Sequence, residues 1–301
     1  MLLPVSIKET NILMHNSCKY KFMGTLIISA AILPGLAFAQ SSDVSAKAYV
    51  LIDSDTKLVV AAENPDLPWT AASLTKLVTA LVVLDTKPNL SKSVTMTRSD
   101  QTVGQCSHGG VCIKSATGVK FTVEDLFNAT IIKSANNAAN ALARSTGLSQ
   151  AQFVKRMNAK AKALGATHSR FYEPTGMNPK NKITAADYGK IVATAFENPY
   201  LSAISQKSNY TLVSTNNSNY DQTIKNSNPL LTSSEVDLVG SKTGYLHESR
   251  YNLATVLKSN GKQFIVVVLG EPHMYTAYAD TKFLATLLSP KNLVVAVNPI
   301  P

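Results

Sequence analysis

The sequence predicts a fold of the α/β class, of the α+β type, in which a five-stranded and largely antiparallel sheet is covered by helices. Two observations support this prediction. Apolar runs typical of strands lie near the two ends of the chain, at residues 46–52, 57–62, 236–242, 251–257 and 263–269. The middle of the chain instead has the apolar spacing of helices. Strands from both ends, with helices between them, are expected to form one sheet on which the helices pack.

Short polar segments join neighbouring strands at both ends of the chain. Ser54-Asp55-Thr56-Lys57 lies between the first two apolar runs and is interpreted as a hairpin turn. Asn260-Gly261 separates the last two apolar runs, and this dipeptide is a strong hairpin signal. Both ends are therefore expected to fold as antiparallel hairpins.

The first helix is expected at residues 74–84, an apolar run with almost no charge, which is typical of a helix buried all round. Lys76 is its one cation and lies on the same helical face as Ser73, three residues earlier. Burial drives the pKa of a lysine down toward neutrality, and a neutral amine can take a proton from a serine hydroxyl. Ser73 and Lys76 are therefore a candidate nucleophile and base.

Further helices are expected at residues 123–132, 137–145, 149–164 and 184–196, and from about residue 275 to near Pro290. Thr122 with Asp125, and Ser149 with Gln152, have the spacing of capping boxes at helix starts. Gly165 is expected to cap the end of the third of these helices.

Two more short motifs follow Ser73 and Lys76 along the chain. Ser134-Ala135-Asn136 falls between two expected helices, where a loop can present a hydroxyl and an amide to a cleft. The alternative is an ordinary helix cap made by Ser134 or Asn136. Lys242-Thr243-Gly244 ends an apolar strand, and its glycine would let a backbone approach a substrate closely. The alternative here is a strand end with a solvated lysine.

The order of these motifs along the chain matters because each motif alone is weak evidence for an active site. Ser-x-x-Lys also occurs at Ser54 and Ser259, in the two expected hairpin turns. Together, Ser-x-x-Lys, Ser-x-Asn and Lys-Thr-Gly form the active-site set of enzymes that attack peptides with a lysine-activated serine.

From about Val44 to about Leu288 the chain resembles the low-molecular-mass penicillin-binding proteins, which are serine D-alanyl-D-alanine peptidases. Beyond the motifs, the resemblance rests on residues 71–77, on residues 153–165 and on residues 171–177. It is closest to the D-alanyl-D-alanine endopeptidase branch, whose loop carries a Glu-Pro-Thr-Gly similar to residues 173–176. The resemblance implies the β-lactamase/transpeptidase-like fold.

The chain departs from the family pattern at several places. Leu246 stands where a threonine is often found, and Asn137 where an aspartate is common. Cys106 and Cys112 lie in what looks like an insertion, and the usual second, all-β domain is not recognised.

The expected mechanism is acyl transfer without a cofactor or metal. Ser73 attacks a D-alanyl carbonyl and Lys76 accepts its proton. Ser134 relays a proton to the leaving amine, Asn136 holds the peptide amide, and Lys242 supplies positive charge near Ser134 and the substrate carboxylate.

Substrate binding is assigned to the residues that follow Lys242. Thr243 is expected to bond the substrate carboxylate, and Gly244 to allow close approach. The resemblance implies that the backbone N–H groups of Ser73 and Tyr245 form the oxyanion hole.

The expected function is an endopeptidase that cleaves D-alanyl cross-links in peptidoglycan, with β-lactam antibiotics as covalent inhibitors. The first alternative is a carboxypeptidase that removes terminal D-alanine. A serine β-lactamase is a further alternative, in which Glu173 would activate the deacylating water. The last alternative is a catalytically silent peptidoglycan-binding protein. Leu246, which stands where the family often has a threonine, gives this alternative slight support.

Residues 1–39 are interpreted as a signal peptide, which leaves a serine peptidase domain at 40–301. Lys19 and Lys21 precede an apolar run at 22–39 that ends in Ala37-Phe38-Ala39, the pattern of signal peptidase. Cleavage is expected after Ala39 and the location is periplasmic. The alternative is a retained membrane anchor.

Cys106 and Cys112 are an even pair in a protein expected to be exported, which predicts a disulfide. A metal site with His108 is the alternative, although the sequence offers no fourth ligand nearby.

The chain has 301 residues, 45% of them hydrophobic and 16% charged, as in a globular protein, and its net charge is +10. An exported enzyme rarely meets nucleic acid, so none is expected as a partner. Peptidoglycan peptides carry carboxylates, and a basic cleft could concentrate them. No basic helix with an apolar face is seen near the C-terminus, so a membrane-surface anchor there is not expected. Peripheral contact with the membrane or cell wall is kept as a partner hypothesis.

Overall fold

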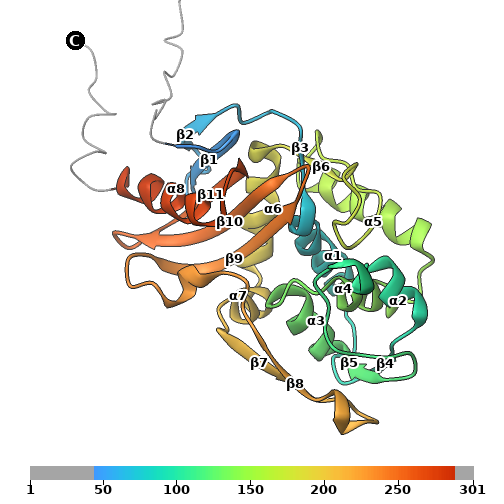
Figure 1. Cartoon of the computed structure of the whole chain (residues 1–301). Helices are drawn as coiled ribbons and strands as arrows, with labels where there is room; N and C mark the ends of the chain where they lie inside the picture. Colours follow the sequence, from blue (N-terminus) through green and yellow to red (C-terminus); the bar gives the residue numbers. More distant parts are fainter. Residues whose placement is uncertain (1–43, 289–301) are drawn as a thin grey trace, which may run out of the picture. The chain divides into compact units, whose positions relative to one another are not determined.

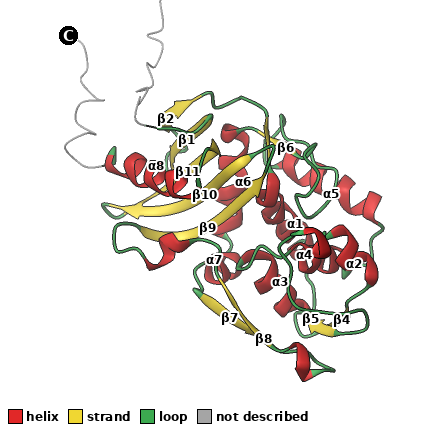
Figure 2. Cartoon of the chain, in the orientation of Figure 1, coloured by secondary structure: helices red, strands yellow, loops and turns green. Residues whose placement is uncertain are grey.

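A five-stranded sheet is the centre of the computed structural model, which describes residues 44–288 (Figures 1 and 2). Its strand order is β2-β1-β11-β10-β9, and every neighbouring pair is antiparallel. The strands are β1 (Ala48–Asp53), β2 (Val59–Glu63), β9 (Asp237–Leu246), β10 (Arg250–Ser259) and β11 (Lys262–Glu271). The predicted sheet, built from the two ends of the chain, is confirmed.

Helices cover both faces of this sheet. Side chains alternate between the faces along a strand, so Val267 of β11 joins the main apolar core with α6 (Ala185–Glu197). Its neighbour Val266 joins a second apolar cluster with α8 (Met274–Thr286). Because apolar side chains lie on both faces, the central strands are almost continuously hydrophobic in sequence.

The region between β2 and β9 is mainly helical. Besides α6, it contains α1 (Thr75–Leu84), α2 (Arg98–Val103), α3 (Val123–Ile131), α4 (Asn136–Arg144), α5 (Gln150–Ala163) and α7 (Pro199–Ser205). Every residue of α1 from Thr75 to Val83 is buried, as its uncharged sequence predicts. The capping boxes at Thr122 and Ser149 are also present.

Three small sheets in this region were not expected from the sequence. They are β3 (Trp69–Thr70) with β6 (Lys182–Ile183), β4 (Ser93–Thr95) with β5 (Lys120–Thr122), and β7 (Asn209–Leu212) with β8 (Gln222–Lys225). Strands of two to four residues are too short to show a clear alternation of polar and apolar side chains.

The strand that carries Lys242 is longer than the predicted 236–242. β9 continues to Leu246 because its pairing with β10 continues, with Gly244 opposite Asn252 and Leu246 opposite Arg250. The Lys-Thr-Gly motif therefore lies within an edge strand of the sheet and not at the strand's end.

The predicted hairpin between β10 and β11 is present. Asn260 and Gly261 both have positive φ, 52° and 75°, as a two-residue type I′ turn requires. The predicted signal peptide and its cleavage position lie outside the described residues. Within residues 44–288, no helix combines the length and apolar character that crossing a bilayer requires.

Candidate active site

Ser73 and Lys76 meet at the start of α1. Ser73 lies in a 3₁₀ turn, Ala72–Leu74, that leads directly into this helix. Ala72 has a φ of 48°, a left-handed conformation that alanine rarely adopts. Lys76 Nζ lies 2.9 Å from Ser73 Oγ and donates a hydrogen bond to it. The i, i+3 spacing therefore brings the two side chains together.

Lys76 is fully buried, yet its amine has three oxygen partners. Besides Ser73, they are Oδ1 of Asn136 at 2.7 Å and the backbone carbonyl of Thr175. Burial lowers the pKa of Lys76 to about 7, and the negative charge of Glu173 opposes this shift. Near neutral pH a substantial fraction of the amine is uncharged and can accept a proton from Ser73.

Glu173 organises the loop that presents the Thr175 carbonyl to Lys76. Its carboxylate accepts hydrogen bonds from the backbone N–H groups of Thr175 at 2.6 Å, Gly176 at 2.7 Å and Asn178 at 3.3 Å. It also accepts from Nδ2 of Asn181 at 2.9 Å and from the Thr175 hydroxyl. A carboxylate occupied in this way is poorly suited to activate a water, the role that the β-lactamase alternative requires.

Gly176 allows this loop to reach the turn that holds Ser73. Its φ is +88°, and a Cβ atom at this position would lie 2.0 Å from the carbonyl oxygen of Ala72. Only glycine can therefore occupy this position without moving one of the two segments.

Ser134 and Lys242 form a second pair of buried side chains. Ser134 lies between α3 and α4 with a φ of 64°. Lys242 of β9 donates hydrogen bonds to Ser134 Oγ at 2.7 Å and to the carbonyl of Thr243 at 2.9 Å. Burial lowers the pKa of Lys242 well below its ordinary value, and the positive charge of Lys76 adds to this effect. Lys242 is 1% exposed, so the alternative of a solvated lysine is wrong.

Asn136 connects the start of α4 to Lys76. Its Oδ1 accepts from the lysine, and its Nδ2 donates to the Gly104 carbonyl at 3.2 Å and to Met177 Sδ at 3.1 Å. The N-cap of α4 is Ala135, and no side chain caps the helix. The alternative of an ordinary helix cap is therefore wrong for Ser134 and Asn136.

Thr243 and Tyr245 belong to the exposed side of β9. Thr243 Oγ1 lies 2.6 Å from Oγ of Ser227, so these two hydroxyls share a hydrogen bond. The ring of Tyr245 is 49% exposed and packs against Tyr251, with 4.5 Å between ring centroids.

Gly244 lies where β9 passes the 3₁₀ turn. A Cβ atom on Gly244 would lie 3.2 Å from both the Ala71 carbonyl oxygen and the Leu74 nitrogen. The glycine therefore lets the backbone of β9 run directly beside the backbone around Ser73.

Several residues of the site border one cleft of about 300 Å³. Its lining includes Ser73, Ser134, Asn136, Thr243, Gly244 and Tyr245. Lys133, His108 and His247 also line it, whereas no aspartate or glutamate is among its described lining residues. The cleft is therefore suited to an anionic ligand.

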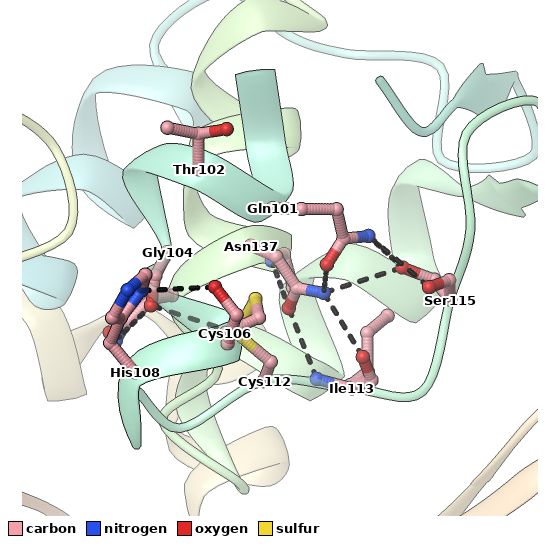
Figure 3. Close-up of a disulfide and its surroundings, with 12 residues drawn as sticks. Gln101, Thr102, Gly104, Cys106, His108, Cys112, Ile113, Ser115 and Asn137 are labelled. Atoms are coloured by element: carbon pink, nitrogen blue, oxygen red, sulfur yellow. Dashed lines mark hydrogen bonds between the residues drawn. A yellow bond between two sulfur atoms is a disulfide. The ribbon is translucent and has the colours of Figure 1, made fainter. Parts of the chain in front are cut away.

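Cys106 and Cys112 are joined in a disulfide, as the sequence predicts (Figure 3), and the residues between them from His108 to Val111 line this cleft. The two sulfur atoms are bonded to each other, so they are not available to the alternative metal site with His108. In residues 44–288, no group of three or more His, Cys, Asp or Glu side chains could hold a metal ion.

Several residues of the site have no signal in the sequence. The Thr175 carbonyl that binds Lys76 is a backbone atom, so no residue type in the sequence indicates it. Ser227, the partner of Thr243, lies in a polar segment whose serines and asparagines look alike. Lys133, next to Ser134, could have been suggested by its position beside the motif.

Comparison with known proteins agrees with this geometry. Residues 36–273 match the family model described as D-alanyl-D-alanine carboxypeptidase. The chain belongs to this family. The D-alanyl-D-alanine endopeptidase of Pseudomonas aeruginosa is 31% identical over 84% of the chain and 80% of its own length. The carboxypeptidase DacF of Bacillus subtilis is also 31% identical, over 75% of the chain and 57% of its own length.

Solved structures of D-alanyl-D-alanine peptidases and related enzymes share the fold. The Streptomyces K15 DD-transpeptidase has a TM-score of 0.75 and 26% identity, and the match covers 81% of this chain and 96% of that one. The D-alanyl-D-alanine carboxypeptidase of Mycobacterium tuberculosis has a TM-score of 0.73 and 26% identity, with 85% and 96% covered. The transpeptidase-like fold, the family and the hydrolase class predicted from the sequence are thereby confirmed.

Proposed function

We propose that this family member is a serine D-alanyl-D-alanine peptidase that acts on peptidoglycan stem peptides through an acyl-enzyme on Ser73. The main support is the contact between Ser73 Oγ and the buried amine of Lys76. Burial gives that amine a pKa of about 7, which suits a base at neutral pH.

Acylation begins when Ser73 Oγ attacks the carbonyl carbon of a D-alanine and its proton passes to Lys76. The C–N bond then breaks, and the leaving amine receives a proton through Ser134, which Lys242 contacts at 2.7 Å. Water afterwards attacks the ester carbon and releases the acyl group and Ser73. The two proton transfers of acylation are supported by the contact between Lys76 and Ser73 and by that between Lys242 and Ser134.

The substrate is held by β9 and by Asn136. Thr243 binds the carboxylate beside the scissile bond, and the buried Lys242 supplies positive charge near Ser134 and this carboxylate. Asn136 Nδ2, which lies 3.1 Å from Met177 Sδ, exchanges this sulfur acceptor for the oxygen of the substrate peptide amide. The backbone N–H groups of Ser73 and Tyr245 stabilise the oxyanion, which the close packing at Gly244 supports.

The charge of the cleft fits this substrate. Lys133, His108 and His247 border the path of a peptide that carries several carboxylates. A β-lactam antibiotic also presents a carboxylate beside a reactive amide, so it is expected to acylate Ser73 and inhibit the enzyme.

Cleavage of D-alanyl cross-links is the preferred activity. The Glu173–Gly176 loop resembles that of the endopeptidases, and three relatives of that name match over most of their length. Among the described residues that line the cleft, there is no arginine to clamp a terminal carboxylate in bidentate fashion. The test compares kcat/KM on a cross-linked muropeptide dimer and on a monomeric pentapeptide. A higher value on the monomer would leave the carboxypeptidase alternative standing.

Labelling with a fluorescent penicillin tests the nucleophile. Ser73→Ala should abolish the label, whereas Ser54→Ala, which changes the same motif in a hairpin turn, should keep it. A labelled Ser73→Ala protein would refute the assignment.

The predicted export is tested on protein secreted into the periplasm. Its N-terminus should be Gln40, and alkylation without reductant should leave Cys106 and Cys112 unmodified. A retained N-terminal segment would favour a membrane anchor.

A further inference from the structure

The segment closed by the disulfide forms one wall of the cleft. Cys106 and Cys112 are half-buried and bonded to each other (Figure 3). The residues between them include His108 and Val111, which line the cleft. We call residues 104–113 the disulfide loop. Inside it, Gly110 and His108 both donate a backbone hydrogen bond to the Gln105 carbonyl at 2.9 Å.

Asn137 holds the C-terminal end of this loop with both halves of its amide. Its Oδ1 accepts from the Ile113 N–H at 3.0 Å, and its Nδ2 donates to the Ile113 carbonyl, also at 3.0 Å. Nδ2 further contacts Gln101 and Ser115 at 3.3 Å (Figure 3). Asn137 is fully buried, so neither half of the amide can exchange these partners for water.

Asn136, the residue before Asn137, connects the disulfide loop to Lys76, because it forms hydrogen bonds with both. Its backbone N–H donates to the Val111 carbonyl at 2.7 Å, and its Nδ2 donates to the Gly104 carbonyl. Its Oδ1 accepts from Lys76. The carbonyls of Val111 and Gly104 thus hold Asn136 in place. Asn136 in turn holds the amine of Lys76.

We propose that Asn137 and the Cys106–Cys112 disulfide are positioning elements for Lys76, acting through the disulfide loop and Asn136. This proposal rests on the proposed function, because it assigns them an effect on acylation of Ser73. Neither Asn137 nor the disulfide touches the reacting atoms.

The chemistry of the amide explains why an asparagine is needed. An ionised aspartate of the same shape accepts hydrogen bonds but cannot donate one to the Ile113 carbonyl. Asn137→Asp would therefore leave that buried carbonyl facing negative charge, and the loop would move away from α4.

Loosening the loop should have a specific signature in the pH dependence of acylation. Water would reach Lys76 and reduce the desolvation that lowers its pKa to about 7. The charged groups already around the amine, Glu173 and Lys242, stay in place, but Asn137→Asp adds a negative charge that also raises the pKa of Lys76. The variant Cys106→Ser/Cys112→Ser adds no charge, so its acid limb reports the loosened loop alone. The acid limb of the acylation profile should therefore move to higher pH.

The experiment measures the acylation rate of the oxidised full-length mature enzyme with a fluorescent penicillin across pH 5 to 9. Asn137→Asp and the double variant Cys106→Ser/Cys112→Ser are compared with the wild type. The matched control is Asn198→Asp, where only the amide oxygen is used, accepting from Tyr200 and Leu201 at the start of α7. Circular dichroism verifies that each variant is folded.

We expect both loop variants to acylate at least about tenfold more slowly, with the acid limb displaced upward, while Asn198→Asp behaves as the wild type. Reducing the folded wild type with dithiothreitol converts the disulfide to two thiols and should reproduce the effect. The same treatment should not affect the double serine variant. If Asn137→Asp does not fold, the reduction experiment on the wild type and the double serine variant still tests the proposal.

Unchanged rates in the reduced enzyme and the double variant would overturn the proposal. Slower acylation with an unmoved acid limb would also overturn it, because the loop would then act only as a wall for the substrate. Absence of labelling in the wild type would instead refute the proposed function.

Discussion

Replacing Glu173 with glutamine tests whether this carboxylate organises the loop or activates water. Its two oxygens accept hydrogen bonds from the Thr175, Gly176 and Asn178 backbone and from the side chains of Asn181 and Thr175. Glutamine has nearly the same shape but keeps only one acceptor oxygen. Whichever oxygen the amide nitrogen replaces, at least one backbone N–H loses its acceptor.

The size of the effect follows from these contacts. A hydrogen bond to a charged group contributes about 1.5–3 kcal/mol, and a buried donor left unpaired costs a similar amount. The free energy of unfolding should therefore fall by about 2–4 kcal/mol in Glu173→Gln. For a domain of this size, that corresponds to a fall in Tm of about 5–15 °C.

The same substitution should shift the pH dependence of acylation in a defined direction. The charge of Glu173 raises the pKa of Lys76 against the effect of burial. Removing this charge lowers the pKa, so the uncharged amine persists to lower pH. The acid limb of the acylation profile should therefore move down, opposite to the shift expected for Asn137→Asp.

Calorimetry and penicillin labelling between pH 5 and 9 provide the measurements. Deacylation should be no slower than in the wild type if Glu173 only shapes the loop. A variant that keeps its Tm and its acylation profile but can no longer release the acyl group would refute this reasoning. It would then favour the β-lactamase alternative.

Three further substitutions have defined outcomes. Gly176→Ala places a Cβ atom 2.0 Å from the Ala72 carbonyl oxygen at positive φ, and should lower the Ser73 acylation rate at least about tenfold in stopped-flow labelling. Tyr188→Phe removes the 2.6 Å hydrogen bond to the buried Leu74 carbonyl and should cost about 1–3 kcal/mol in chemical denaturation. Burial raises the pKa of Glu271 to about 8, so its protonated form stabilises the fold at low pH, and this stability is lost as pH rises toward 8. Glu271→Gln should flatten the decline in Tm that the wild type shows between about pH 5 and 8; an equally steep decline in the variant would contradict this.

The sequence predicted the parts of the site whose roles depend on residue type and short spacing. Ser73 and Lys76 are three residues apart, and the uncharged surroundings of Lys76 indicated its burial and lowered pKa. The motifs around Ser134 and Lys242 were found by their order, although their distance in space is not encoded locally.

What the sequence did not predict depends on long-range geometry. The Thr175 carbonyl reaches Lys76 because Glu173 folds the loop and Gly176 lets it approach, and no side-chain pattern records a backbone acceptor. The extension of β9 to Leu246 likewise depends on pairing with β10, because Lys242 and Thr243 interrupt the apolar run. Tertiary pairing overrides local propensity at such positions.

The position of β1 between β2 and β11 has a consequence for the nascent chain. The hairpin of β1 and β2 is made early, but the second edge of β1 has no partner until β11, which ends at Glu271, has followed. Lys242 reaches Ser134 only when β9 joins the same sheet, and contacts between such distant segments form slowly. Until β9 and β11 have been synthesised, Lys76 is therefore expected to remain a solvated amine, and the chain acquires its reactive serine only when almost all of the described residues are available to fold.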